Sequence, residues 1–293
     1  MLIRIMYYGL LAIAFSFLAG QLGLFSLMVP VAFAISAYTM AILETKNILF
    51  FPYSALLGII FALALSAFLG VLVNRSKGTY FLMLTLVLGQ LVWAVALQWV
   101  SLTKGTSGIS GVNIPYPFNM AKNGSNILFY YFILVVFLIC IILLYALINS
   151  SFGMKLRGIR ESESRMIMLG YNVSLIKWAA FMISSFVSSI AGIFFVYFSG
   201  VMNPDSIALN ASVQVMIASI FGGVSSILGA IFGTGIIKTL EIVLSGITQR
   251  YLLIIGVMFL IVIMLLPKGI MDIAERVLKF GTRLFKKNSR YTF

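Results

Sequence analysis

The chain has 293 residues, of which 62% are hydrophobic and only 9% are charged, and its formal net charge is +13. No water-soluble domain of this size could cover its surface with so few charged side chains. Continuous apolar runs recur along the chain, and about 20 such residues suffice to cross a bilayer. Because backbone inside lipid must satisfy its own hydrogen bonds, spans are helices or closed barrels, and the lack of apolar–polar alternation excludes a barrel. The composition therefore predicts an all-α, polytopic transmembrane helical bundle.

The apolar runs predict about eight to ten membrane segments. In chain order, they are expected at residues 5–19, 22–43, 48–73, 79–101, 127–148, 176–199, 209–221, 224–243 and 250–266. One of the first two is expected to be broken or re-entrant at Gly20 and Gly23. Residues 1–266 should form one transmembrane domain. Residues 267–293 should form a basic amphipathic tail that lies on the membrane surface.

The basic residues are concentrated in three places. The Arg75/Lys77 turn, the loop 149–177 and the tail together hold 14 of the 20 basic side chains. Lys and Arg are retained on the cytoplasmic side of a membrane, where anionic lipid headgroups attract them. The distribution therefore predicts a multi-pass protein of the cytoplasmic membrane with a cytoplasmic C-terminus and contact with lipid rather than nucleic acid. Two full spans before Glu44 would leave Arg4 outside, against this charge rule.

Several kinds of chemistry are missing from the chain. It contains no histidine, its one cysteine is Cys140 in an apolar run, and the dipeptide Gly-Lys of a Walker A loop does not occur. We therefore expect no catalytic residue, metal or bound cofactor, and a membrane-embedded enzyme would lack an active site. Ionisable residues within the predicted spans are almost confined to Lys238 and Glu241, which could pair on one helix. Coupling of transport to protons usually requires carboxylates or histidines within the membrane. A transport protein with so few intramembrane charges is therefore expected to be energised by another protein.

The loop 149–177 is the most polar interruption, with five basic and two acidic side chains. Between Gly153 and Gly170 its sequence predicts a short helix. The apolar positions at helical spacing are Leu156, Ile159, Met166 and Leu169, and the charged positions on other faces are Arg157, Arg160, Glu161 and Arg165. Such a helix could seat its apolar side in a groove of a cytoplasmic partner. The same pattern would suit a helix that lies on lipid headgroups.

A glycine cluster marks residues 221–235. Gly229 and Gly233 have the spacing at which small residues let membrane helices pack closely. Gly222 and Gly223 predict a break between two half-helices near a translocation path.

Polar residues inside the predicted spans are candidates to line that path. They are Thr85, Gln90, Gln98, Gln214, Ser184, Ser185, Ser188 and Ser189. Gln90 and Gln214 must avoid lipid, so they face protein or water, where they serve either as cargo contacts or as interhelical hydrogen bonds. For the serines we expect bonds to their own helix instead.

Short matches to a known family occur in order along about 250 residues. In the loop they are Ser151, Gly153, Arg157-Gly158-Ile159-Arg160-Glu161, Glu163, Gly170 and Lys177; elsewhere they include Gly20-Gln21, Ala37-Tyr38, Arg75, Thr85-Leu86, Gly108-Ile109, Gly222-Gly223 and Pro267. On these residues the chain resembles the permease subunits of branched-chain amino acid ABC importers, most closely the M-type subunit. Lys104, Ser225 and Arg165-Met166 depart from the family pattern.

The resemblance implies an inner-membrane permease, in a bacterium or archaeon, that is not itself an enzyme. Its implied partners are a second, H-type permease, two ATP-binding subunits that use the ATP, and an extracytoplasmic solute-binding protein. The segment that contacts the ATPase would lie in the loop and include Gly153, Arg157, Ile159, Arg160, Glu161, Glu163 and Gly170. Two alternatives remain open: a permease for urea or short amides in the same family, and a stand-alone secondary carrier or channel.

Overall fold

The computed structural model describes residues 1–293 except 77, 113, 115–126, 249, 266–268 and 270–293. In the described part of the chain, six helices are long and apolar enough to cross a membrane: Leu2–Leu22, which comprises α1 (Leu2–Phe17) and a π-helical turn η1 (Leu18–Leu22), then α3 (Tyr53–Val73), α4 (Gly78–Gln98), α6 (Ile127–Asn149), α9 (Val173–Ser199) and α11 (Ile227–Ser245). Shorter apolar helices are α2 (Val29–Thr45), α10 (Leu209–Gly222) and α12 (Tyr251–Leu265). The predicted all-α membrane bundle is confirmed.

The remaining described elements connect these helices. They are α5 (Val100–Thr103), η2 (Gly105–Ser107), α7 (Ser151–Glu161), α8 (Glu163–Met168) and η3 (Pro204–Ile207), and two paired strands of two residues each, β1 (Ile109–Ser110) and β2 (Val201–Met202). The predicted amphipathic tail 267–293 lies outside the described residues, apart from Gly269.

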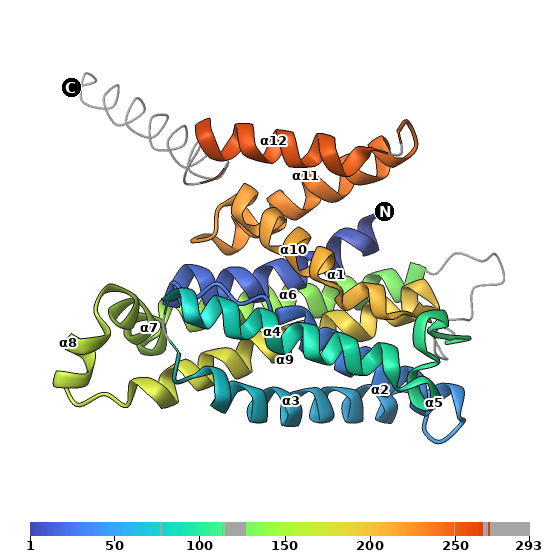
Figure 1. The fold of residues 1–293 in the computed structure, drawn as a ribbon, viewed down its shortest axis with the longest axis horizontal. Coiled ribbons are helices and arrows are strands. Elements are labelled where there is room, and N and C mark those ends of the chain that lie inside the picture. Colours follow the sequence, from blue (N-terminus) through green and yellow to red (C-terminus); the bar gives the residue numbers. More distant parts are fainter. Residues whose placement is uncertain (77, 113, 115–126, 249, 266–268, 270–293) are drawn as a thin grey trace, which may run out of the picture.

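The long helices lie roughly parallel or antiparallel along one axis, so the bundle has two ends (Figure 1). The end with α7 and α8 also carries the break after α1 and the turn between α10 and α11. The opposite end carries the N-terminus, α5 and the turn between α11 and α12. This placement puts Arg4 at the end remote from α7.

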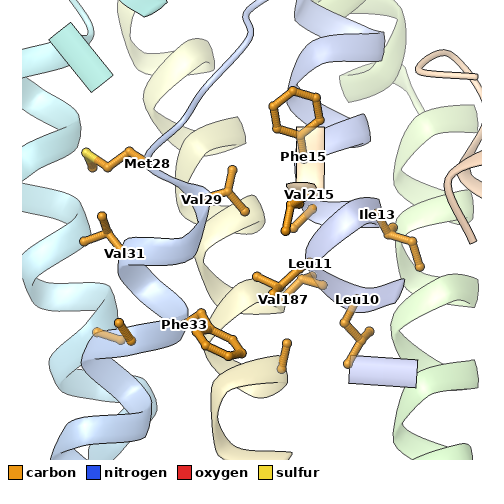
Figure 2. Packing of buried hydrophobic residues seen from close by; sticks show 14 of the residues in the cluster. Leu10, Leu11, Ile13, Phe15, Met28, Val29, Val31, Phe33, Val187 and Val215 are labelled. Atoms are coloured by element: carbon orange, nitrogen blue, oxygen red, sulfur yellow. The ribbon is translucent and has the colours of Figure 1, made fainter. Parts of the chain in front are cut away.

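The centre of the bundle is formed by α1, α2 and α9. In Figure 2, Leu11 of α1, Phe33 of α2 and Val187 of α9 are part of one apolar cluster, which Val215 of α10 joins. The helices approach closely because Gly192 of α9 lies against the backbone of Phe33, where a side chain would clash. Without a hydrophobic drive between helices in lipid, such close packing is what holds membrane helices together.

The predicted interruption of the first membrane segments is present. After α1 the chain forms the π-helical turn η1, Gly23 takes a left-handed conformation with φ of 71°, and helix resumes only at Val29. The non-helical residues 23–28 need hydrogen-bond partners inside the bundle. The Thr85 hydroxyl accepts from the Leu27 amide at 3.3 Å, and the Ser188 hydroxyl donates to the Val29 carbonyl at 2.6 Å. The break is therefore supported by side chains from α4 and α9.

At the end remote from α7, a carboxylate joins three helices. Glu44 Oε1 at the end of α2 accepts hydrogen bonds from the Ser54 hydroxyl of α3 at 2.7 Å and from the Tyr197 hydroxyl of α9 at 2.5 Å. Hydrogen bonds to a charged group are about twice as strong as neutral ones.

Replacing Glu44 by alanine is expected to destabilise the purified protein by about 1–3 kcal/mol, because two hydroxyls lose a charged acceptor. Thermal unfolding in detergent, followed by circular dichroism, would measure this loss of stability. Lys46→Ala, at an exposed position two residues further on, is the matched control and should leave the melting temperature unchanged. Equal melting temperatures for the two variants would contradict the bracing role of Glu44.

Candidate functional site: the α7–α8 element and the neighbouring helix breaks

The polar loop 149–177 folds into two helices rather than the single helix expected. The hydroxyl of Ser150 caps α7 by accepting from the Phe152 amide at 3.2 Å. Ser162 then adopts an extended conformation with φ of −160°, which ends α7, and its hydroxyl caps α8 by accepting from the Arg165 amide at 3.4 Å. Serine competes for backbone hydrogen bonds and favours helix ends over interiors. Ser162 therefore divides the segment.

The apolar side of this element is already covered by the protein's own chain. Leu156, Ile159 and Met166 have exposed fractions of 0%, 5% and 8%, whereas Leu169 is 71% exposed. Met166 folds back over α7, and its sulfur lies where a side chain on Gly158 would stand. The expectation that these four apolar residues form one face for a partner is therefore wrong. The first three fix α7 and α8 to the bundle.

Arg160 is exposed on α7, but its guanidinium group reaches the break after α1. One guanidinium nitrogen, Nη1, donates to the carbonyl oxygen of Gly20 at 2.5 Å, and its aliphatic stem lies beside Gly23. Gly20 lies in the last turn before the break, where carbonyl groups have no partner within the helix, and a charged donor forms a stronger hydrogen bond with such a group than a neutral one. Arg160 thus ties α7 directly to the break that follows α1.

Glu163 is paired within the protein. Its carboxylate forms an ion pair with Lys177 at the start of α9, at 3.0 Å, with side-chain exposures of 23% and 7%. A buried ammonium without a carboxylate would be costly, so this pair anchors α8 on α9.

The predicted end residues of the segment have separate structural roles. Gly153 lies so close to the Ile148 carbonyl that no side chain would fit at the corner between α6 and α7. Gly170 has φ of 82°, a conformation that other residues rarely adopt, and it reverses the chain after α8. The outward surface, here named the α7–α8 outer face, consists of Arg157, Glu161, Arg165, Ile167 and Met168, all of them exposed.

The second glycine cluster forms a close-packed turn at the same end of the bundle. Helix α10 ends at Gly222, Gly223 has φ of 114°, and α11 begins at Ile227. The two helices run side by side, and both Gly229 and Gly233 lie directly against the backbone of Gly222. Gly269, after α12, packs against the backbone of Gly223. A break in the helical path is present at the predicted position, and its role as a gate stays a prediction.

The two breaks touch each other. Gly20 lies against the Val224 carbonyl, with no room for a side chain between them. The Ser16 hydroxyl of α1 donates to the same carbonyl at 2.6 Å. A continuous series of contacts therefore runs from Arg160 on α7, through Gly20, to the turn between α10 and α11.

The predicted path residues lie apart from one another. Thr85 is fully buried and holds the irregular residues 23–28. Gln214 accepts from the Lys238 ammonium at 3.3 Å, which joins α10 to α11. Gln90 is half-buried on α4 and has no hydrogen-bond partner within the described ranges, while Gln98 is exposed at the end of that helix. None of these four side chains lines the cavities at Lys238, at Lys177 or at Arg75.

The serines of α9 act mostly between helices. Ser184 donates to the Ala14 carbonyl of α1 at 2.9 Å, and Ser188 donates to the Val29 carbonyl. Ser189 donates to Phe186 in its own helix at 2.7 Å, and Ser185 is buried. The expected bond to the own helix is therefore present for Ser189 and wrong for Ser184 and Ser188, because neighbouring helices approach closely enough to offer carbonyl groups.

Lys238 and Glu241 do pair, as their spacing predicted, with 2.6 Å between Nζ and Oε2. The Lys238 ammonium also lies 3.8 Å from the centroid of the Tyr8 ring. Sequence reasoning missed this ring contact, as well as the bonds of Arg160 to Gly20 and of Tyr197 to Glu44, since each joins residues far apart in the chain. The available signal for the last of these was the position of Glu44, a charged residue at the end of an apolar run.

Comparisons with known proteins agree along most of the chain. Residues 1–264 match the family described as "Branched-chain amino acid transport system / permease component". The chain is 24% identical, over 94% of its length and 70% of the relative's, to the high-affinity branched-chain amino acid transport system permease protein LivM of Escherichia coli strain K12. It is 25% identical to the LivM protein of Salmonella typhimurium over the same shares.

A third relative matches about half of the chain. The high-affinity branched-chain amino acid transport system permease protein LivH of Salmonella typhimurium is 28% identical over 48% of this chain and 46% of its own length. No solved structure matches the chain.

Proposed function

This chain belongs to the branched-chain amino acid transport system permease component family, and on that premise we propose that it works as one of two permease subunits of an ABC importer. The cargo is a branched-chain or related small amino acid. The observation that carries the assignment is the family match over residues 1–264 in a multi-pass helical chain. ATP hydrolysis belongs to two partner subunits, and a solute-binding protein delivers the cargo.

The α7–α8 outer face is the docking surface for an ATP-binding subunit. It exposes three charged side chains, Arg157, Glu161 and Arg165, together with the apolar side chains of Ile167 and Met168. Docking surfaces typically combine apolar contacts with charges that fix the orientation of the partner. The ion pair of Glu163 with Lys177 and the bond of Arg160 to Gly20 make the element rigid enough to transmit movement.

The end that carries α7 and α8 faces the cytoplasm. The turn between α3 and α4, which contains Arg75, lies at this end with the segment that contains α7 and α8 and its basic residues (Figure 1). Such basic residues are expected on the cytoplasmic side of a bacterial or archaeal inner membrane. Gly269 packs on Gly223 at this end, which supports a cytoplasmic C-terminus. The charge rule is broken at Arg4, because the first helix crosses fully and leaves the N-terminus outside.

A second permease covers part of the apolar surface. Helix α12 exposes Leu252, Leu253, Val257, Leu260 and Ile261, and lipid or a partner helix must cover them. The LivM and LivH relatives are both named as permease proteins of one kind of transport system. We assign the present chain to the LivM-like position, because the LivM match spans nearly its full length.

Charge reversal on the α7–α8 outer face tests the docking role. The double variant Arg157→Glu/Glu161→Lys should lower ATP-driven leucine uptake by the reconstituted complex at least about tenfold, since misplaced interfacial charges cost several kcal/mol. It should also reduce the amount of ATP-binding subunit that copurifies. Arg75→Glu, an exposed reversal at the same end but off this face, is the matched control and should retain uptake.

Normal coupling in the double variant would contradict docking on this face. ATP-independent uptake by the chain alone in liposomes would instead identify a stand-alone carrier or channel. Uptake of urea or short amides, but not leucine, by the complete complex would reassign the cargo and leave the ABC mechanism in place.

A further inference from the structure

A polar cavity of about 450 Å³ lies at the end of the bundle remote from α7 and α8. Its walls are the first turns of α1, the end of α9, the end of α11 and the start of α12. Its volume is in the range typical of small-molecule sites, which are usually about 300–1,000 Å³. None of the residues argued above for docking or for the helix breaks lines this cavity.

Of the charged side chains that line the cavity, some have partners within the protein and others do not. The Lys238 ammonium is occupied by Glu241 Oε2 at 2.6 Å, Gln214 Oε1 at 3.3 Å and the face of the Tyr8 ring. Arg4, by contrast, lines the cavity with no hydrogen-bond or ion-pair partner among the described residues. Only one oxygen of Glu241 is engaged by Lys238, so its second oxygen can accept another donor. The cavity thus offers one available cation and one available carboxylate oxygen.

One wall of the cavity is aromatic. The ring of Tyr7 lies 5.5 Å from that of Phe195 and 6.2 Å from that of Phe198, measured between centroids. Both phenylalanines come from the last turns of α9 and line the cavity with Tyr7. An apolar wall opposite a few placed charges is the arrangement by which pockets bind small amphiphilic ligands.

From this arrangement we propose that the cavity binds a free α-amino acid with an aliphatic side chain. Arg4 takes the carboxylate, which its planar guanidinium matches in two parallel hydrogen bonds. The free oxygen of Glu241 takes the ammonium group. The aliphatic side chain lies on Phe195 and Phe198, which the buried Tyr7 ring supports from behind. The inference rests on the proposed function, since in the proposed orientation this end faces the extracytoplasmic side from which the amino acid arrives.

Arg4 and Glu241 would hold the amino acid briefly before translocation. Arg4 is exposed rather than buried, so the pair with the ligand carboxylate stays partly solvated and weak. A carrier needs such weakness, because cargo that binds tightly cannot leave. Arg4, which departs from the positive-inside rule, would therefore serve to bind cargo.

Cysteine protection would test the proposal directly. The full chain, with its partner subunits in lipid nanodiscs, would carry Cys140→Ala and Ser245→Cys, so that the cavity holds the one thiol of this chain. Modification by a charged thiol reagent would be followed with increasing L-leucine. Ser107→Cys, exposed at the same end but outside the cavity, is the matched control.

We expect L-leucine to slow modification of the Ser245→Cys protein several-fold and to leave the Ser107→Cys protein unaffected. Adding Arg4→Gln should raise the leucine concentration needed for half-maximal protection about two- to fivefold, the effect of losing a solvent-exposed ion pair. Among leucine analogues, 4-methylpentanoate should retain protection that depends on Arg4, whereas 3-methylbutylamine should lose it.

Three results would overturn the proposal: no protection by leucine, protection that persists unchanged in Arg4→Gln, or equal protection by both analogues. If phosphatidylglycerol, and not leucine, protected the Ser245→Cys thiol, the cavity would bind a lipid phosphate. That result would also overturn the proposal. ATP-driven leucine uptake, measured on the same sample, separates the two ideas. If the complex takes up leucine but leucine does not protect the Ser245→Cys thiol, the assignment as an importer stands and only the proposed binding site is refuted.

Discussion

Replacing Arg160 by alanine is expected to lower ATP-driven leucine uptake about 10- to 100-fold, which corresponds to the 1.5–3 kcal/mol of a hydrogen bond from a charged group. The guanidinium is the direct link from α7 to the Gly20 carbonyl. Without it, displacement of the docking element would no longer be transmitted to the break after α1. ATP hydrolysis should continue, because the α7–α8 outer face is unaltered.

The contrast with a docking variant makes this prediction specific. Loss of docking lowers the amount of bound ATP-binding subunit, whereas Arg160→Ala should leave that amount unchanged and waste ATP. Arg160→Lys keeps the charge but loses the planar donor group, so intermediate uptake is expected. Copurified subunit, ATPase rate and uptake would be measured on one preparation. Tight coupling in Arg160→Ala would refute the transmission role.

Replacing Gly233 by leucine is expected to destabilise the protein by about 1–3 kcal/mol or more, the cost of overpacking a well-packed contact. The new Cβ would meet the Ala218 carbonyl and lie 2.5 Å from the amide nitrogen of Gly222. These are backbone atoms, which cannot rotate away, so α10 and α11 would have to separate. The expected readout is a melting temperature several degrees lower in detergent.

Gly256→Leu is the matched control for that variant. Gly256 lies in another apolar helix, α12, and a Cβ there would have nothing within 4 Å in the described structure. The same change of residue should therefore be tolerated, and it even removes a glycine from a helix interior. If both variants melted alike, the close contact between α10 and α11 would not contribute to stability.

The membrane segments could be predicted because each depends on local composition. A sufficiently long apolar run forms a membrane helix because of the surrounding lipid, whichever segments pack beside it. The observed helices lie close to the expected ranges. The break at Gly20 and Gly23 was also visible locally. Glycine removes the barrier to positive φ, and Gly23 uses that freedom.

The site was less accessible to sequence reasoning, and Arg160 and Leu156 show why. The pattern of the loop 149–177 gave an amphipathic helix but not the surface on which its apolar side would rest. Leu156, Ile159 and Met166 proved to face the protein's own bundle. Arg160 bonds a residue 140 positions away. The outward face is what remains after those contacts form, so it follows only from tertiary structure.

By itself, the sequence determined the class of protein, the positions of the helices, the family and the polar segment that interrupts the apolar chain. These follow from transfer of side chains into lipid and from local backbone preferences, which each segment carries with it. Tertiary structure alone decided that Arg160 meets Gly20, that Gly233 meets Gly222, and that Arg4 and Glu241 share one cavity. In lipid, helices associate through close packing and a few polar contacts, and such contacts exist only once distant segments have come together.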